Sequence, residues 1–197
     1  MNRKITLLVL FIMCIATLSA QQYKRIISLA PSITQSLYYL GAEDKLVGRT
    51  SYCVAAENDN IEIVASAVTL NVEKAVSMKP DLVLVLGLTD QKDIETLRKF
   101  GIEVMVYESP KTFKEIAEQF VELGKMVGKA NVAQQIIAES EERIKEIQKE
   151  RAGKPVPNIF FQLGSNPLFT VTPNTFMDDY IQLMGGKNIS SELNKGI

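Results

Sequence analysis

The stretch from Asn131 to Arg151, NVAQQIIAESEERIKEIQKER, contains no proline or glycine and decides how the rest of the chain is arranged. At 1.5 Å per residue, about 21 residues make a helix of roughly 30 Å, which matches the diameter of a small domain. One narrow stripe holds most of its large apolar side chains: Ile136, Ile137, Ile144 and Ile147. A helix that is apolar only along a stripe lies on a surface or bridges two lobes. We therefore expect residues 129–153 to form the backbone between two lobes.

Before this helix, residues 24–128 alternate short apolar runs with amphipathic stretches. The apolar runs predict strands at 25–29, 46–48, 82–86 and 102–107. The run LVLVL at 82–86 is apolar on both faces, as expected for a strand of a parallel sheet that is covered on both sides. Strands that alternate with helices indicate right-handed crossovers. We therefore predict an N-terminal α/β lobe over 24–128.

Capping signals mark the helices of this lobe. Pro31 presets the backbone for a helix that ends before Gly41, and Ser32 with Gln35 fits a capping box. Further expected elements are a polar loop over 50–61, a helix over 72–78 capped by Asn71, a helix that begins at Thr89-Asp90, and a helix to Val127 opened by a capping box of Thr112 with Glu115.

After the long helix, residues 155–197 predict a strand at 158–163, a turn at 164–167 and a helix at 175–184. These 43 residues carry more large apolar side chains than so short a piece can bury alone: Phe160, Phe161, Phe169, Phe176 and Met184. We interpret them as the start of a second α/β lobe that this sequence leaves incomplete. The alternative is that the piece packs on the first lobe. The expected fold class is α/β, with two Rossmann-like lobes joined by one long helix.

Residues 1–20 are typical of a cleavable signal peptide. Arg3 and Lys4 precede an apolar run over 5–15, which is too short to span a bilayer comfortably. We therefore expect export to the periplasm, with an uncleaved anchor as the alternative. A lipid anchor at Cys14 is not expected, because a methionine precedes it where a small residue is usual. After cleavage, Cys53 is the only thiol, and we interpret it as a small buried residue.

Composition excludes several classes of function. The chain has no histidine, which excludes a Ser–His or Cys–His catalytic pair and counts heavily against an imidazole-rich zinc or manganese site. It also lacks a Gly-x-Gly-x-x-Gly motif and a Walker loop. With 22 basic and 23 acidic residues, it offers no broad basic face for nucleic acid. We predict no catalytic residue, no metal site and no resident cofactor. A small transferase of the doubly wound α/β class and a non-functional fragment remain as alternatives.

Five strings of sequence, in this order, resemble the helical-backbone periplasmic binding proteins, the BtuF-like class. They extend the resemblance from about residue 24 to the end, and a family chain would continue past Ile197. The strings are RIISLAPSITQSLYYLG at 25–41, VGRTSYC at 47–53, NVEKAVSMKPDLVL at 71–84, FFQLGSNPLFT at 160–170 and LMGGKNI at 183–189.

This resemblance implies a monomeric substrate-binding protein of an ABC importer. Such a protein captures cobalamin, haem or an iron-siderophore in the cleft between its lobes and delivers it to a permease served by an ATPase. In this chain, Ala67 and Leu86 fall near positions at which the cobalamin binder of the family has tryptophans, and the chain contains no tryptophan. The resemblance therefore leaves haem and siderophores open beside cobalamin. A tyrosine such as Tyr52 is able to ligate haem iron.

The resemblance also implies individual site residues. Matching positions predict ligand contacts by Ala30, Pro31, Ser32, Tyr52, Leu86 and Phe169. The first three follow a predicted strand and open a helix, where ligands of open α/β sheets bind. Glu73 matches the first-lobe glutamate that docks on permease arginines in this family, a contact that gives orientation and electrostatic steering.

Overall fold

The computed structural model describes residues 23–66, 69–87 and 89–193, so the predicted signal peptide, Cys14 and Ala67 lie outside the described residues. Its larger sheet has five parallel strands in the order β3-β2-β1-β4-β5. These strands are β1 (Ile26–Ser28), β2 (Leu46–Thr50), β3 (Glu62–Ala65), β4 (Leu82–Leu86) and β5 (Glu103–Tyr107). The prediction of a parallel α/β sheet is confirmed.

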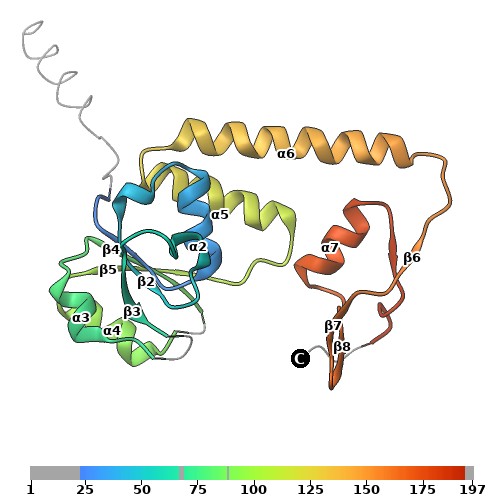
Figure 1. The fold of residues 1–197 in the computed structure, drawn as a ribbon. Coiled ribbons are helices and arrows are strands. Elements are labelled where there is room, and N and C mark those ends of the chain that lie inside the picture. Colours follow the sequence, from blue (N-terminus) through green and yellow to red (C-terminus); the bar gives the residue numbers. More distant parts are fainter. Residues whose placement is uncertain (1–22, 67–68, 88, 194–197) are drawn as a thin grey trace, which may run out of the picture.

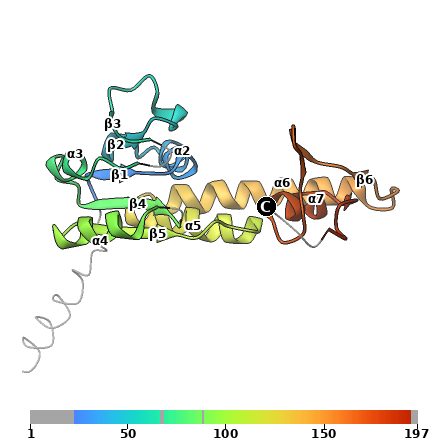
Figure 2. The same cartoon turned by 90° about the horizontal axis from the view of Figure 1, so that it is seen from below.

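Helices cover both faces of this sheet (Figures 1 and 2). On one face, α2 (Pro31–Tyr39), α5 (Phe113–Met126) and the first turns of α6 (Ala130–Arg151) bury a core with β1 and β4. On the other face, α3 (Val72–Ser77) and α4 (Gln91–Lys99) pack on the same strands. Two short 3-10 helices, η1 (Glu43–Lys45) and η2 (Val54–Ala56), lie in the connections on either side of β2.

The long helix is present as predicted, since α6 is unbroken from Ala130 to Arg151. Its first half is anchored in the core of the first lobe, where Ala133 is buried and Ile136 and Ile137 pack beside it. Its second half extends beyond that lobe and carries the chain to the second unit (Figures 1 and 2). The helix therefore sets the distance between the two parts of the protein.

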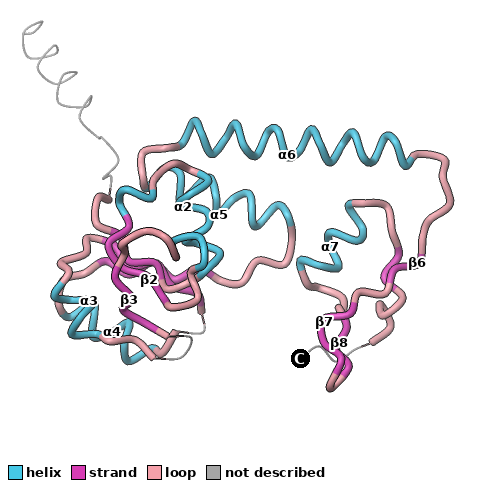
Figure 3. Tube along the Cα trace, viewed as in Figure 1, coloured by secondary structure: helices cyan, strands magenta, loops and turns pink. Residues whose placement is uncertain are grey.

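The second unit, residues 155–193, stands beside the first lobe instead of covering its sheet (Figure 3). Its strands β6 (Asn158–Ile159) and β9 (Lys187–Asn188) are parallel, and α7 (Phe176–Leu183) lies between them in sequence. A hairpin of β7 (Gln162–Ser165) and β8 (Leu168–Thr170) is inserted before α7. The unit is thus built on a β–α–β crossover, as the interpretation of a second α/β lobe requires.

A buried polar network, together with Val171 and Ile181, forms the centre of this unit. The amide nitrogen of Asn188 donates to Asp178 Oδ1 at 2.8 Å and to the Val171 carbonyl at 3.1 Å. Gln182 donates to the other oxygen of Asp178 at 2.8 Å. Because these buried polar atoms are hydrogen-bonded, the unit orders its short strands with little apolar core.

The local capping signals were predicted with mixed success. The predicted caps Asn71 and Thr112 each accept the backbone N–H three residues ahead, and so does Thr175, which was not predicted as a cap. The capping box of Ser32 with Gln35 is wrong: α2 begins at Pro31, its N-cap position is an alanine, and no side chain caps it. Ser32 therefore lies inside the helix, since a proline occupies the first helical position.

Two strand predictions also need correction. The expected strand at 158–163 is two strands, because β6 pairs with β9 and β7 pairs with β8 in a separate sheet. Strand β3 was not predicted, since its sequence, EIVA, follows a long polar loop and is short. It is the edge strand of the five-stranded sheet and is held there by β2.

Packing of α6 on α5 predicts a sensitive position at Gly124. A Cβ atom there would lie 2.5 Å from the Cβ of Ala133 and 3.2 Å from the Lys129 carbonyl oxygen. We expect Gly124→Ala to lower the free energy of unfolding by about 1–3 kcal/mol, because overpacking outweighs the gain in helix propensity. Chemical denaturation measures this, and adding Ala133→Gly should recover part of the loss. A Gly124→Ala protein as stable as the parent would contradict the packing.

Candidate functional site

The five parallel strands of the larger sheet all end at the edge that faces the second unit (Figure 1). After β1 the chain enters α2 on one face of the sheet, and after β4 it enters α4 on the other face. This change of face between neighbouring strands is the topological switch point, where open α/β sheets bind ligands. The site is therefore expected at the carboxyl ends of β1 and β4.

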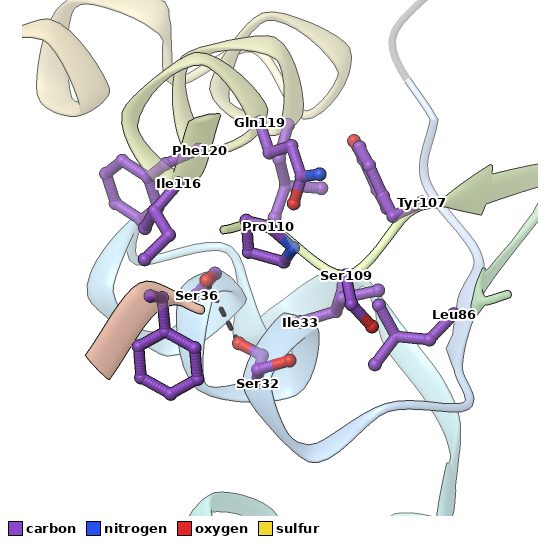
Figure 4. A pocket seen from close by; sticks show the side chains of 12 residues that line it. Ser32, Ile33, Ser36, Leu86, Tyr107, Ser109, Pro110, Ile116, Gln119 and Phe120 are labelled. Carbon is purple, nitrogen blue, oxygen red and sulfur yellow. Dashed lines mark hydrogen bonds between the residues drawn. The ribbon is translucent and has the colours of Figure 1, made fainter. Parts of the chain in front are cut away.

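An apolar cavity of about 390 Å³ opens on the α5 side of this edge. Its size falls within the range of small-molecule sites. Its lining comes from α2, α5, the ends of β4 and β5 and, across from the first lobe, α7: Ser32, Ile33, Ser36, Leu86, Tyr107, Ser109, Pro110, Ile116, Gln119, Phe120, Leu123 and Phe176. Figure 4 shows Ser32, Ile33 and Ser36 of α2 on the side of the cavity opposite Ile116 and Phe120 of α5. We call this space the apolar cavity.

The few polar groups of the apolar cavity are uncharged. Burial, with a smaller contribution from the Glu122 carboxylate, raises the pKa of the Tyr107 phenol, so this group stays protonated near neutral pH. Ser36 donates to the Ser32 carbonyl at 3.0 Å, and Gln119 donates to the Glu108 carbonyl at 2.9 Å. The cavity therefore offers an apolar wall with neutral hydrogen-bonding groups at its margin.

A second space of about 160 Å³ lies at the same edge, on the side of α3 and α4, and we call it the polar cavity. Leu86 lines both cavities and separates them. The polar cavity is lined by Leu29, Ala30, Pro31, Thr50, Ala65, Ser66, Thr69, Leu70, Leu86, Thr89, Asp90 and Asp93. Asp90 Oδ1 caps α4 by accepting from the Lys92 N–H at 2.8 Å. No lysine or arginine is among the described residues that line either cavity.

The structure brings four of the six predicted ligand positions together at this edge. Ala30 and Pro31 line the polar cavity, Ser32 lines the apolar cavity and Leu86 lines both. Tyr52 lies in the turn after β2 and Phe169 lies on β8; they are 59% and 36% exposed, and neither lines these two cavities.

Most of the residues that line these cavities were not predicted as site residues, and Phe176, Ser109 and Pro110 show why. From the sequence, Phe176 was interpreted as a core residue of the second lobe, but its side chain lines the apolar cavity at the edge of the first lobe. Ser109 and Pro110 follow β5, and their place beside α2 depends on the strand order. The carboxyl end of the predicted strand at 102–107 was the one signal that could have pointed to Ser109 and Pro110.

Glu73, the predicted docking residue, is exposed in the first turn of α3. Its neighbour Lys74 is engaged elsewhere, since its ammonium group lies 2.6 Å from a Glu62 carboxylate oxygen and donates to the Ile63 carbonyl at 2.9 Å. The Glu73 carboxylate therefore faces solvent on the outside of the lobe.

Cys53 lies behind the site in a buried cluster of hydroxyl groups. Its sulfur is 3.0 Å from the Thr34 hydroxyl and 3.2 Å from the Thr50 hydroxyl. Thr34 also contacts the Ser28 hydroxyl at 2.9 Å, and the Thr50 hydroxyl accepts the Tyr52 N–H at 3.1 Å. The cluster ties the ends of β1 and β2 to α2, which holds the Tyr52 turn in place.

Because Cys53 is fully buried, we expect its thiol to resist modification in the folded protein. In a Cys14→Ser background, Cys53 is the only thiol, and DTNB absorbance would report on it alone. In native buffer, the reaction of Cys53 with DTNB should be as slow as the local or global unfolding that exposes the thiol. In denaturant, the reaction should be immediate. Rapid reaction in native buffer would contradict the buried cluster.

Among residues 23–66, 69–87 and 89–193, no group of three or more Cys, Asp or Glu side chains is arranged to hold a metal ion. Within the same part of the chain, no helix is long and apolar enough to cross a membrane.

Comparison with known proteins finds vitamin B12-binding proteins among the relatives of this chain. A vitamin B12-binding protein of Yersinia pseudotuberculosis is 31% identical over 186 residues, which cover 93% of this chain and 66% of the relative. The chain thus spans about two thirds of the length of the curated relatives it matches. These relatives are named as vitamin B12-binding proteins, which supports the prediction of a binding protein over the transferase alternative.

Solved structures of the same kind share the fold. The periplasmic vitamin B12-binding protein BtuF of Vibrio cholerae superposes with a TM-score of 0.70 at 28% identity, over 88% of this chain and 68% of that one. The periplasmic haem-binding protein HutB of Vibrio cholerae gives a TM-score of 0.75 at 22% identity, over 85% and 66%, and supports the fold alone. Residues 26–196 match the family described as periplasmic binding protein. By this match and by its fold, the chain belongs to the periplasmic binding protein family.

Proposed function

We propose that this chain is the substrate-binding component of an ABC importer and that it captures a cobalamin-like corrinoid at the carboxyl edge of the larger sheet. One observation carries the choice of ligand: the described residues that line the two cavities offer an apolar wall, hydroxyl groups and carboxylates, and no lysine or arginine is among them. Exported by residues 1–20, the protein would work as a monomer in the periplasm and hand its ligand to a permease with its ATPase.

The chemistry of the ligand decides between the alternatives. A corrin ring carries primary amides around its rim, and amide N–H groups need acceptors such as the carboxylates of Asp90 and Asp93 and the hydroxyl of Thr89. Haem carries two carboxylates and catecholate siderophores carry negative charge, and both need cations where they bind. The lining of the polar cavity therefore favours the neutral, amide-rich ligand over the anionic ones.

The absence of tryptophan does not weaken this choice, because other apolar side chains are available. Ile33, Phe120 and Phe176 give the apolar cavity flat and branched walls on which the ring can pack. A ring wider than either cavity would lie across Leu86, with its amides over the polar cavity.

The remaining predicted contacts extend this proposal. Tyr52 and Phe169 would contact parts of the ligand that project beyond the two cavities, and an exposed phenol or phenyl ring suits such a contact. Glu73 would meet the permease, because a carboxylate exposed on the outside of the lobe is free to pair with a cationic partner.

The ligand preference can be tested by isothermal titration calorimetry. We expect cyanocobalamin to bind more tightly than haemin and a ferric catecholate siderophore, by at least about tenfold, because the charges of the latter two ligands meet no cation in the described lining. Dicyanocobinamide, which keeps the amide-bearing ring, should bind comparably to cyanocobalamin. Tighter binding of haemin or of the siderophore would overturn the proposal.

Asp93 offers a test inside the polar cavity. We expect Asp93→Ala to weaken cyanocobalamin binding about tenfold, because the ligand amides lose a charged acceptor. Asp44→Ala removes the same charge from an exposed position outside both cavities and is the matched control. Equal affinities of the two variants would place the ligand elsewhere.

A further inference from the structure

Apart from the connection through α6, the second unit meets the first lobe at the start of α5. Figures 1 and 2 both place α7 next to the end of α5 at which this helix begins. There, Asp179 Oδ2 of α7 accepts a hydrogen bond from the backbone N–H of Phe113 at 2.7 Å. Residues 113 and 179 are far apart in sequence, so this contact depends on how the two parts of the protein are placed.

The Phe113 N–H has no partner of its own within α5. It belongs to the first helical residue, and the first N–H groups of a helix lack a carbonyl four residues back. The local caps serve other groups, because Thr112 accepts the Glu115 N–H at 3.1 Å and Glu115 accepts the Lys111 N–H at 2.6 Å. Asp179 thus supplies the acceptor that α5 lacks, and its negative charge is favoured at a helix N-terminus.

The same turn of α7 also forms part of the apolar cavity. Phe176 lies three residues before Asp179, so both side chains project from one face of the helix. Phe176 is the described residue of the second unit that lines the cavity, opposite α2 and the carboxyl ends of the strands. Docking of Asp179 therefore determines where Phe176 stands.

We infer that Asp179 is a positioning residue, which docks the second unit on the N-terminus of α5 and thereby sets the width of the apolar cavity before a ligand binds. The consequence for affinity rests on the proposed function, whereas the docking itself does not. Because the cavity wall is already in place, the protein loses less conformational entropy when a ligand binds, and the affinity is higher.

A proline at position 113 tests the contact at a single atom. Phe113→Pro removes the N–H that Asp179 accepts, proline is favoured at the first helical position, and the extended backbone of Thr112 tolerates a following proline. Phe113→Ala is the matched control, since it removes the same ring and keeps the N–H. Asp179→Ala removes the acceptor from the other side, and Glu192→Ala is its charge-matched control at an exposed residue.

The first readout needs no ligand. Spin labels on Tyr39→Cys and Lys187→Cys, both at exposed positions, would report the distance between the two parts in a Cys14→Ser background, with the buried Cys53 left in place. We expect Phe113→Pro and Asp179→Ala to lengthen and broaden this distance, and both controls to leave it unchanged. The double variant should change it no further than either single variant, because both remove one contact. A Phe113→Pro distance equal to that of Phe113→Ala would overturn the inference.

The second readout is calorimetry with cyanocobalamin. Loss of the contact should weaken binding about tenfold in both variants and in neither control. If the parent chain does not bind cyanocobalamin, the proposed function fails while the distances still decide the docking. If Phe113→Pro prevents folding, as judged by circular dichroism, Asp179→Ala and the milder Asp179→Asn decide it alone, because neither changes a residue of α5.

Discussion

The packing of α6 on α5 is the constraint on which the rest of the structure depends. Gly124 lets the backbone of α5 approach Ala133, and the buried start of α6 continues the core of the first lobe. Because α6 is unbroken from there to Arg151, its direction at the base determines where the second unit lies. The packing of α6 on α5 therefore fixes the direction of a helix that is as long as a small domain. This direction places α7 opposite the carboxyl edge of the sheet.

At that edge, one residue divides two environments. Leu86 ends the strand β4, which is buried on both faces, and its side chain stands between the apolar and the polar cavity. The parallel arrangement makes this possible, since every strand ends on the same side and the chain leaves β1 and β4 toward opposite faces. A ligand with an apolar ring and a polar rim is complementary to such a divided surface.

The second unit solves a different physical problem. It has little apolar core, and its order rests on the hydrogen bonds that join Asp178, Asn188 and Gln182. Meanwhile several of its large apolar side chains are exposed: Val156, Phe160, Phe161, Leu163, Leu168, Phe169, Phe176 and Tyr180. Polar groups that are mutually satisfied specify one arrangement of short strands, whereas exposed rings are available for contacts with ligand or protein.

The sequence by itself determined the features that depend on neighbouring residues. A run without proline or glycine predicted α6, the apolar run LVLVL predicted β4, and Asn71 and Thr112 marked their helix starts, because helix propensity and capping act over a few residues. Only the tertiary structure decided the features that depend on distant partners: the strand β3, the separation of β6 from β7, and the place of Phe176 and Asp179 against the first lobe. Such contacts join residues far apart along the chain, so their free energy is decided by how α6 and the sheet place them, which no local pattern records.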